Sequence, residues 1–233
     1  MHPTAKAARI AGALYMLLVL TAPWRLVYIP NKLFVKGNAT ATAGNIVAHE
    51  SLFRLGIVCD LLTGVIVLFV VLAFYRLFKP VSQLHAALVV MLGGLMVTPI
   101  YFLNTLNDAA ALLLARGAEF LSVFDKPQRD AMAMLFLRLH HQGVLANEIF
   151  WGLWLFPLGI LVFRSRFLPR FLGVWLIVNG FAYLAISFTG LLLPEYESTV
   201  SNFAFPAMLG EVATMLWLLI RGAKVPPAAA ATS

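Results

Sequence analysis

Charged residues are scarce in this sequence, and their scarcity is the first guide to its class. Only 12% of its 233 residues are charged, whereas a soluble domain usually carries about 25%. Hydrophobic residues make up 61% of the chain. This balance predicts that lipid rather than water surrounds most of the chain. The length suits one compact helix bundle better than two domains.

Cysteine and the common catalytic motifs are also scarce or absent. Cys59 is the only cysteine, which excludes an intramolecular disulfide and a thiolate metal cluster. The sequence contains no Gly-rich phosphate loop, no Ser-x-x-Lys, no Gly-x-Ser-x-Gly and no His-Glu-x-x-His motif. The sequence therefore does not indicate a nucleotide hydrolase or one of the commonest kinds of serine hydrolase.

Acidic residues are missing from one set of loops between the apolar runs. These loops and the adjoining ends of the chain carry basic residues only: Lys6, Arg9, Arg76, Lys79, Arg164, Arg166, Arg170, Arg221 and Lys224. Because Lys and Arg collect in cytoplasmic loops, both termini are expected to be cytoplasmic. The net charge of +7 is therefore explained by the basic residues of these loops. It does not indicate a nucleic-acid partner, and none is predicted.

Six apolar runs are long enough to cross a bilayer, which takes about 20 residues per helix. Their expected limits are 10–29, 52–78, 84–114, 143–163, 171–193 and 203–221. The polar segment 31–50 is rich in Gly, Ala and Thr and is expected to be a loop. The sequence therefore predicts an all-α polytopic bundle in the cell membrane, with one domain over 1–225. The Pro- and Ala-rich tail 226–233 is expected to be disordered.

The fourth helix is expected to begin outside the bilayer. Asp125, Pro127 and Gln128 have the pattern of a capping box with proline in the first turn, and the helical pattern continues to Phe163. Such a helix would be roughly 55 Å long, well beyond the ~30 Å hydrocarbon core. We expect residues 126–140 to form an outer or interfacial helix, followed by a bend near Gly143. Whether this helix lies on the membrane or caps a pocket stays open.

Polar side chains occur at similar depths in the outer halves of several predicted spans. Ionisable groups are costly in a bilayer and need partners, so we expect these side chains to line one outward-facing pocket. The candidate pocket residues are Arg54, Asp60, Asn104, Asn107, Asp108, His140, His141, Asn147, Glu148 and Glu211.

Spacing adds detail to this predicted pocket. Glu50 and Arg54 are expected to pair at its rim. His140 and Asn147 are seven residues apart and share one helix face, and so do His141 and Glu148. Glu211 is expected about two turns into the sixth span.

Some of these residues could hold a metal ion, because zinc accepts His and carboxylate ligands together. The candidate ligands are His140, Glu148 and Glu211, with Asp60 as an alternative. Since two residues two turns apart on one helix cannot chelate an ion alone, another helix would have to contribute. The same residues would also suit a network of paired charges that only locks the helices together. No cofactor is identified from the sequence.

Three functions therefore stay open. The leading hypothesis is binding or translocation of a small polar ligand or cation, with Arg54 balancing the carboxylates or holding an anionic head group. The second is a membrane-embedded hydrolase of a lipid-like substrate, in which His140 and Glu148 would handle protons with or without a metal. The third is a structural or assembly protein. The sequence does not decide whether the protein is an enzyme, and it predicts no oligomeric state.

Four segments of the chain are similar to a known family. They are Glu50-Ser-Leu-Phe-Arg-Leu-Gly-Ile-Val58, Phe102-Leu-Asn-Thr-Leu-Asn107, Phe150-Trp-Gly-Leu-Trp-Leu-Phe-Pro-Leu-Gly159 and Phe167-Leu-Pro-Arg-Phe-Leu-Gly173. Over nearly the whole chain the sequence resembles the bacterial membrane family called domain of unknown function 4386. The resemblance implies a polytopic bacterial membrane protein and no particular activity. The family pattern has His at the position of His140 and often Asn at that of His141, which implies that His140 is the stronger candidate.

Overall fold

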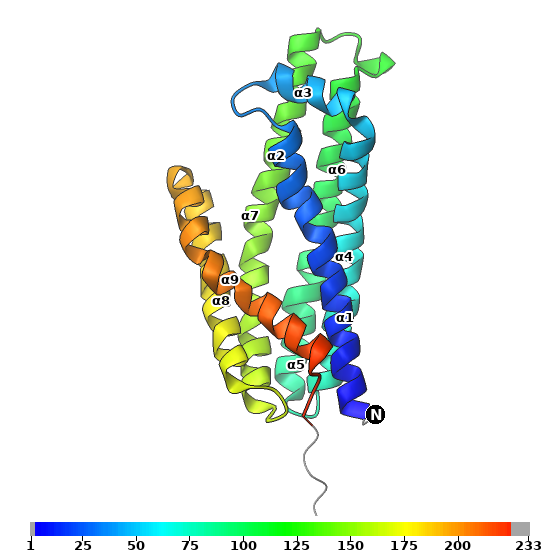
Figure 1. The fold of residues 1–233 in the computed structure, drawn as a ribbon. Helices are drawn as coiled ribbons and strands as arrows, with labels where there is room; N and C mark the ends of the chain where they lie inside the picture. Colours follow the sequence, from blue (N-terminus) through cyan, green and yellow to red (C-terminus); the bar gives the residue numbers. More distant parts are fainter. Residues whose placement is uncertain (1–2, 225–233) are drawn as a thin grey trace, which may run out of the picture.

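The computed structural model describes residues 3–224, and this part of the chain is built from helices without a β-strand (Figure 1). The helices are α1 (Pro3–Pro23), α2 (Ile29–Leu33), α3 (Ala39–Ala48), α4 (Glu50–Phe78), α5 (Gln83–Val90), α6 (Val97–Arg116), α7 (Lys126–Arg164), α8 (Arg170–Leu192) and α9 (Glu197–Ile220). The predicted tail 226–233 lies outside the described residues.

Two π-helical turns join neighbouring helices into longer units. Trp24–Tyr28 connects α1 to α2, and Met91–Leu95 lies between α5 and α6. Counting these joined units, six helical stretches of the described chain are long and apolar enough to cross a membrane. The predicted all-α polytopic bundle is therefore confirmed.

The segment 31–50 is not the loop that was predicted, because it holds helix α3. The side chain of Asn38 caps this helix by accepting a hydrogen bond from the backbone N–H of Ala41 at 2.9 Å. Ala43 and Ile46 are buried, and Ile46 packs in a cluster with residues of α6 and α7. These two apolar positions, three residues apart, give the segment a buried helical face. A loop was predicted because the segment is polar overall, and the spacing of Ala43 and Ile46 was not taken into account.

Helix α7 is one continuous helix of 39 residues. Its predicted capping box is confirmed, since Asp125 and Gln128 exchange side chain-to-backbone hydrogen bonds of 2.8 and 3.0 Å. The helix continues through Gly143 without a break. Gly143 makes room for Asn104, whose Oδ1 a Cβ at this position would overlap. Residues 126–140 thus prolong the spanning helix rather than forming a separate one.

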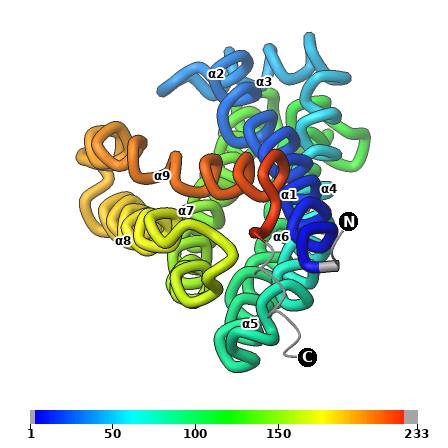
Figure 2. Tube along the Cα trace, turned by 60° about the horizontal axis from the view of Figure 1, so that its bottom comes forward, coloured from blue at the N-terminus to red at the C-terminus, as the bar shows by residue number. Residues whose placement is uncertain are grey.

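Both ends of the described chain lie at the same end of the bundle (Figures 1 and 2). The backbone N–H of Lys224 donates to the carbonyl oxygen of Phe167 at 3.0 Å, and Gly222 lies close to Ala5 and Arg9. The basic, acid-free loops of the sequence meet here. We call this the inner end, because the distribution of basic residues predicts that it faces the cytoplasm. The opposite end is called the outer end.

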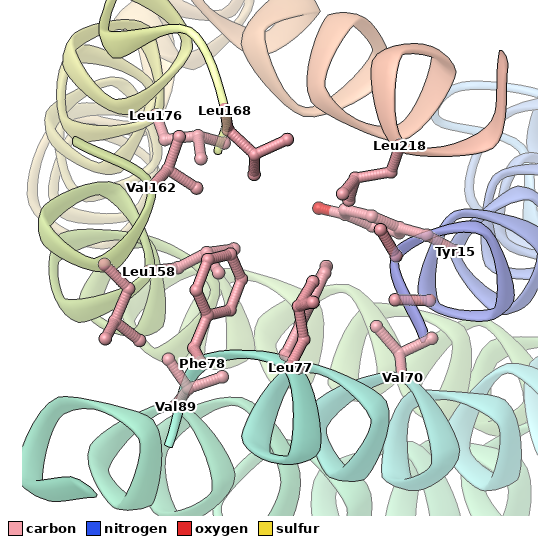
Figure 3. Packing of buried hydrophobic residues seen from close by; sticks show 14 of the residues in the cluster. Tyr15, Val70, Leu77, Phe78, Val89, Leu158, Val162, Leu168, Leu176 and Leu218 are labelled. Atoms are coloured by element: carbon pink, nitrogen blue, oxygen red, sulfur yellow. The ribbon is translucent and has the colours of Figure 1, made fainter. Parts of the chain in front are cut away.

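Buried apolar side chains form a core in the inner half of the bundle. Figure 3 shows Tyr15 of α1, Val70 of α4, Leu158 of α7 and Leu218 of α9 pointing into a common interior. The Tyr15 ring packs edge-on against Trp154, with 6.1 Å between ring centroids. Toward the outer end, α8 and α9 lean away from α1 and α4 (Figures 1 and 2). The inner core therefore closes the bundle beneath the polar groups described below.

Four glycines allow α7 and α8 to pack backbone against backbone. A Cβ on Gly159 would lie 2.7 Å from the carbonyl oxygen of Gly173, and a Cβ on Gly173 would lie 2.6 Å from that of Gly159. Gly152 and Gly180 make the same reciprocal approach, at 2.7 and 2.9 Å. The two contacts are seven residues apart on each helix, so they lie on one face. Small residues are what permit such close approach between membrane helices.

Replacing Gly159 with Ala is expected to force these backbones apart and to lower stability by about 1–3 kcal/mol. Gly44→Ala is the matched control, because a Cβ at Gly44 meets no atom within 4 Å. Thermal unfolding of both variants in the same detergent measures the effect. Equal melting temperatures for the two variants would contradict the packing role of Gly159.

Candidate metal centre

A buried ion pair joins the first helical unit to α6. Arg25 lies in the π-helical turn Trp24–Tyr28 and donates from Nε to Asp108 Oδ2 at 2.5 Å and from Nη2 to Asp108 Oδ1 at 2.6 Å. The Arg25 side chain is 3% exposed, and that of Asp108 is fully buried. The guanidinium also lies 5.5 Å from the centre of the Phe34 ring. Two parallel hydrogen bonds fix the direction of both side chains as well as neutralising their charges.

His140 of α7 approaches the same carboxylate from another side. Its Nδ1 lies 3.2 Å from Asp108 Oδ1 and 3.3 Å from the backbone oxygen of Asn104. A neutral imidazole with its proton on Nδ1 donates to one of these acceptors and presents a lone pair on Nε2. His140 Nε2 is buried and has no hydrogen-bond partner among the described residues. Metal-binding histidines are commonly oriented in this way, by a hydrogen bond from the nitrogen that does not bind the metal.

Asp60 of α4 completes the group. It is 1% exposed, and neither carboxylate oxygen has a hydrogen-bond partner within residues 3–224. Asp60, Asp108 and His140 each offer one ligand atom, and these atoms all lie within 4.8 Å of one another. We call these three residues the Asp60 cluster. A buried carboxylate without partners is strongly unfavourable, so a cation among these atoms would stabilise the arrangement.

The Asp60 cluster lies near the outer edge of the bilayer. Asp60 precedes Phe78, the inner end of α4, by 78 − 60 = 18 residues, or about 27 Å of helix. The hydrocarbon core is about 30 Å thick. A pocket of about 310 Å³ borders the cluster and includes Arg25 and His140 in its lining. Arg138 and His141 also line this outer pocket and are exposed, so it opens at the outer surface.

Arg54 does not take part in the cluster. Its side chain is 54% exposed and donates from Nε to Glu50 at 2.7 Å, which confirms that Glu50 and Arg54 pair as predicted. Arg116 reaches the same carboxylate at 3.2 Å. Arg54 was expected to supply the positive charge beside the buried carboxylates, and Arg25 supplies it instead.

The polar residues of α7 lie on two different faces of the helix, as their spacing predicted. His140 and Asn147 face α6, where Asn147 donates from Nδ2 to the carbonyl of Val97 at 3.5 Å. His141 lies on another face, with its Nε2 3.2 Å from Oε2 of Glu197, the first residue of α9. Glu148 shares the His141 face and is half-buried. Its Oε2 has no partner among the described residues.

Asn104 and Asn107 differ in their relation to the cluster. Asn104 is 3% exposed and takes part through its backbone oxygen, which accepts from His140. Asn107 is half-buried and directly precedes Asp108 in the sequence, and its side chain forms no hydrogen bond with another described residue.

Glu211 lies deeper than expected. Because α9 begins at Glu197, Glu211 is 211 − 197 = 14 residues into the helix, about four turns rather than two. It accepts a hydrogen bond from the Tyr15 hydroxyl and another from Asn179 Nδ2 at 3.1 Å. The structure therefore does not bring together the predicted ligand set of His140, Glu148 and Glu211. Within the described residues it places His140 with Asp60 and Asp108 instead.

Arg25 was absent from the residues singled out by sequence. It is the only charged residue in the first apolar run, 10–29. A lone cation in a membrane span requires a carboxylate or another polar partner. This requirement could have identified Arg25 as a member of the polar group. Asp108 is the partner that the fold supplies.

Asp108→Asn is expected to destabilise the protein by about 3–5 kcal/mol, because it leaves the Arg25 charge buried without a partner. The double variant Arg25→Met, Asp108→Asn should recover part of this loss. Unfolding midpoints in detergent measure both variants. Glu50→Gln, which breaks an exposed pair, serves as the control and should cost about 1 kcal/mol or less. If the double variant loses as much stability as Arg25→Met and Asp108→Asn lose together as single variants, the two residues are not coupled.

Comparison with known proteins gives a family and no activity. A family model described as "Domain of unknown function (DUF4386)" matches residues 10–222, which confirms the resemblance seen in the sequence motifs. An uncharacterised protein from Archaeoglobus fulgidus is 32% identical over 80 residues, or 33% of this chain. That match spans 44% of the relative's length, so less than half of it. No solved structure matches the chain.

Proposed function

This chain belongs to the DUF4386 family, and from the geometry of its own site we propose that this multi-pass membrane protein binds a divalent cation at Asp60, Asp108 and His140. One observation carries the proposal. Three ligand atoms from three helices lie within 4.8 Å of one another, and the buried Asp60 carboxylate has no other partner among the described residues. This refines the expected role in binding a small polar ligand or cation.

The donor set favours zinc or a similar transition metal. Imidazole with carboxylates suits Zn²⁺, whereas Ca²⁺ requires six to eight oxygen ligands. The formal charges support a divalent ion. Asp60 and Asp108 carry two negative charges, Arg25 carries one positive charge, and a net negative charge is left for the metal to neutralise. Because Asp108 already accepts two hydrogen bonds from Arg25, Asp60 and His140 would be the stronger ligands.

The geometry supports binding more directly than translocation. The Asp60 cluster borders a pocket that opens at the outer surface, and an apolar core occupies the inner end of the bundle. We place the protein in the cell membrane with this pocket facing outward, because the basic residues gather at the other end.

A metal-dependent hydrolase of a lipid-like substrate is the second candidate function. Three protein ligands leave a coordination position for water or substrate. The adjoining pocket combines Arg25, Arg138 and His141 with the apolar side chains of Phe34 and Leu137. Such a lining suits an amphiphile whose anionic head group lies at the bilayer surface. There the metal would activate a bound water molecule for hydrolysis.

The neighbouring histidines of α7 provide a matched test of the metal site. His140→Gln is expected to reduce zinc affinity at least about tenfold, because it removes a ligand that hydrogen bonds hold in place. His141→Gln should retain the wild-type affinity, since His141 faces Glu197. Metal content by mass spectrometry and zinc titration by calorimetry measure both variants. Equal affinity in the two variants would refute the proposed site.

Asp60→Asn distinguishes a metal ligand from a member of a stabilising network. Zinc should stabilise the wild type and raise its melting temperature. At a free zinc concentration of a hundred times Kd, the stabilisation should be about 2.7 kcal/mol. The variant should show no such response. Without metal it should be at least as stable as the wild type, because an unpartnered buried charge has been removed. A metal-free variant that melts well below the wild type would support the structural role instead.

A further inference from the structure

A second pocket, of about 330 Å³, lies between α1 and α9 and is lined mainly by apolar and aromatic side chains. Six aromatic residues contribute to its wall: Tyr15, Tyr101, Trp151, Trp154, Tyr183 and Phe205. Among the described residues, Glu211 is the one carboxylic acid in the lining, and no Lys or Arg lines the pocket. We call it the inner pocket. It is separate from the outer pocket beside the Asp60 cluster, although Leu26 lines both.

The aromatic rings of the inner pocket are held in place by one another. Trp151 stacks on Tyr101 with 6.1 Å between centroids and meets Tyr183 edge-on at 5.8 Å. Trp154 meets Tyr15 edge-on at 6.1 Å. Rings arranged in this way form a preformed wall, so a ligand would lose little side-chain freedom on binding.

Glu211 has neutral hydrogen-bond donors and no cationic partner. The Tyr15 hydroxyl donates to Oε1, and Asn179 Nδ2 donates to Oε2 at 3.1 Å. Within residues 3–224, Glu211 forms no ion pair. Tyr15 and Asn179 orient the carboxylate toward the pocket, and no described residue supplies a counter-charge.

The carboxylate also lies well inside the hydrocarbon region. Glu211 precedes the inner end of α9 at Ile220 by 220 − 211 = 9 residues, which is at most about 14 Å of helix. The core is about 30 Å thick, so Glu211 is near its middle. A charge at this depth is expensive unless a cation or a proton accompanies it.

The inner pocket is accessible from the bilayer. Phe205 and Leu209 of α9 line it, yet they are 60% and 39% exposed on the surface of the bundle. In a membrane-spanning helix such exposed apolar side chains face lipid. The outer part of α9 also leans away from α1 (Figures 1 and 2). A hydrophobic ligand can therefore reach the pocket without crossing the apolar inner core.

From these observations we infer that the inner pocket binds a hydrophobic organic cation that enters from the bilayer, such as a quaternary ammonium or phosphonium ion. Aromatic faces attract cations of this kind, and Trp and Tyr are the most effective rings. Glu211 supplies the counter-charge, and the remaining apolar lining accommodates the hydrocarbon part. This binding does not depend on metal at the Asp60 cluster.

Tetraphenylphosphonium and tetraphenylborate test the inference, because they have nearly the same size and shape and opposite charge. Calorimetric titration is carried out on the full chain in an uncharged maltoside detergent. Choline lipids are avoided, since their head group is itself a quaternary ammonium ion. The wild type is expected to bind the phosphonium at least about tenfold more tightly than the borate. Equal binding of the two ions, or preference for the borate, would overturn the inference.

Glu211→Gln is expected to abolish the preference for the phosphonium. Glu148→Gln should keep that preference and serves as the control, because Glu148 is another half-buried carboxylate that does not line the inner pocket. Full phosphonium affinity in Glu211→Gln would overturn the role of the carboxylate.

Ala22→Phe provides a second variant that keeps Glu211 and its hydrogen bonds. Ala22 lines the inner pocket, so the added ring should occupy the pocket and weaken phosphonium binding at least about tenfold. Unchanged binding in this variant would show that the ion binds elsewhere. Zinc affinity should be unaffected by either pocket variant, so failure of this inference is separable from failure of the metal site.

Discussion

The structure depends on an ion pair that has to exist inside a membrane. Arg25 and Asp108 are both almost fully buried, and either one alone would be strongly unfavourable there. Their pairing fixes the first helical unit against α6 and turns the Asp108 carboxylate toward His140. Because Asp108 is satisfied by Arg25, the negative charge of Asp60 is left over. That uncompensated charge, rather than the ion pair itself, gives the cluster its capacity to bind a cation.

Features set by neighbouring residues were predictable from the sequence. The Glu50–Arg54 pair and the Asp125–Gln128 capping box depend only on spacing within one helix, and both were found as expected. The six apolar stretches followed from composition and length. Helix α3 was missed because its buried face consists of few residues within a polar segment. The start of α9 was missed as well, and the depth of Glu211 was misjudged with it.

The grouping of side chains from different helices could not be derived in the same way. Whether His140 meets Asp60 or Glu211 depends on the rotation and tilt of four helices, and a sequence read one helix at a time contains neither quantity. Arg25 shows the limit of that approach most clearly. Its position in an apolar run signalled a need for a partner, but the identity of the partner was set by the π-helical turn and by the packing of α1 against α4.

The motifs that carry the family resemblance prove to be mainly packing motifs. Gly152 and Gly159 lie in one of them and Gly173 in another, and these glycines bring α7 and α8 into backbone contact. Asn104, in a third, contributes its backbone oxygen to the orientation of His140. The family match therefore describes how the helices are held together, and the chemistry has to be argued from the polar residues between them.

The π-helical turn at Trp24–Tyr28 gives the first span a mechanical property that a regular helix would lack. Such a turn holds one residue more than an α-helical turn. Rewinding it to α-helix would therefore shift one part of the span by one residue, or about 100° of rotation, relative to the other. That rotation would carry Arg25 away from Asp108 and move Leu26, which borders both pockets. Because Leu26 lines both pockets, a change in this one turn would alter the walls of both.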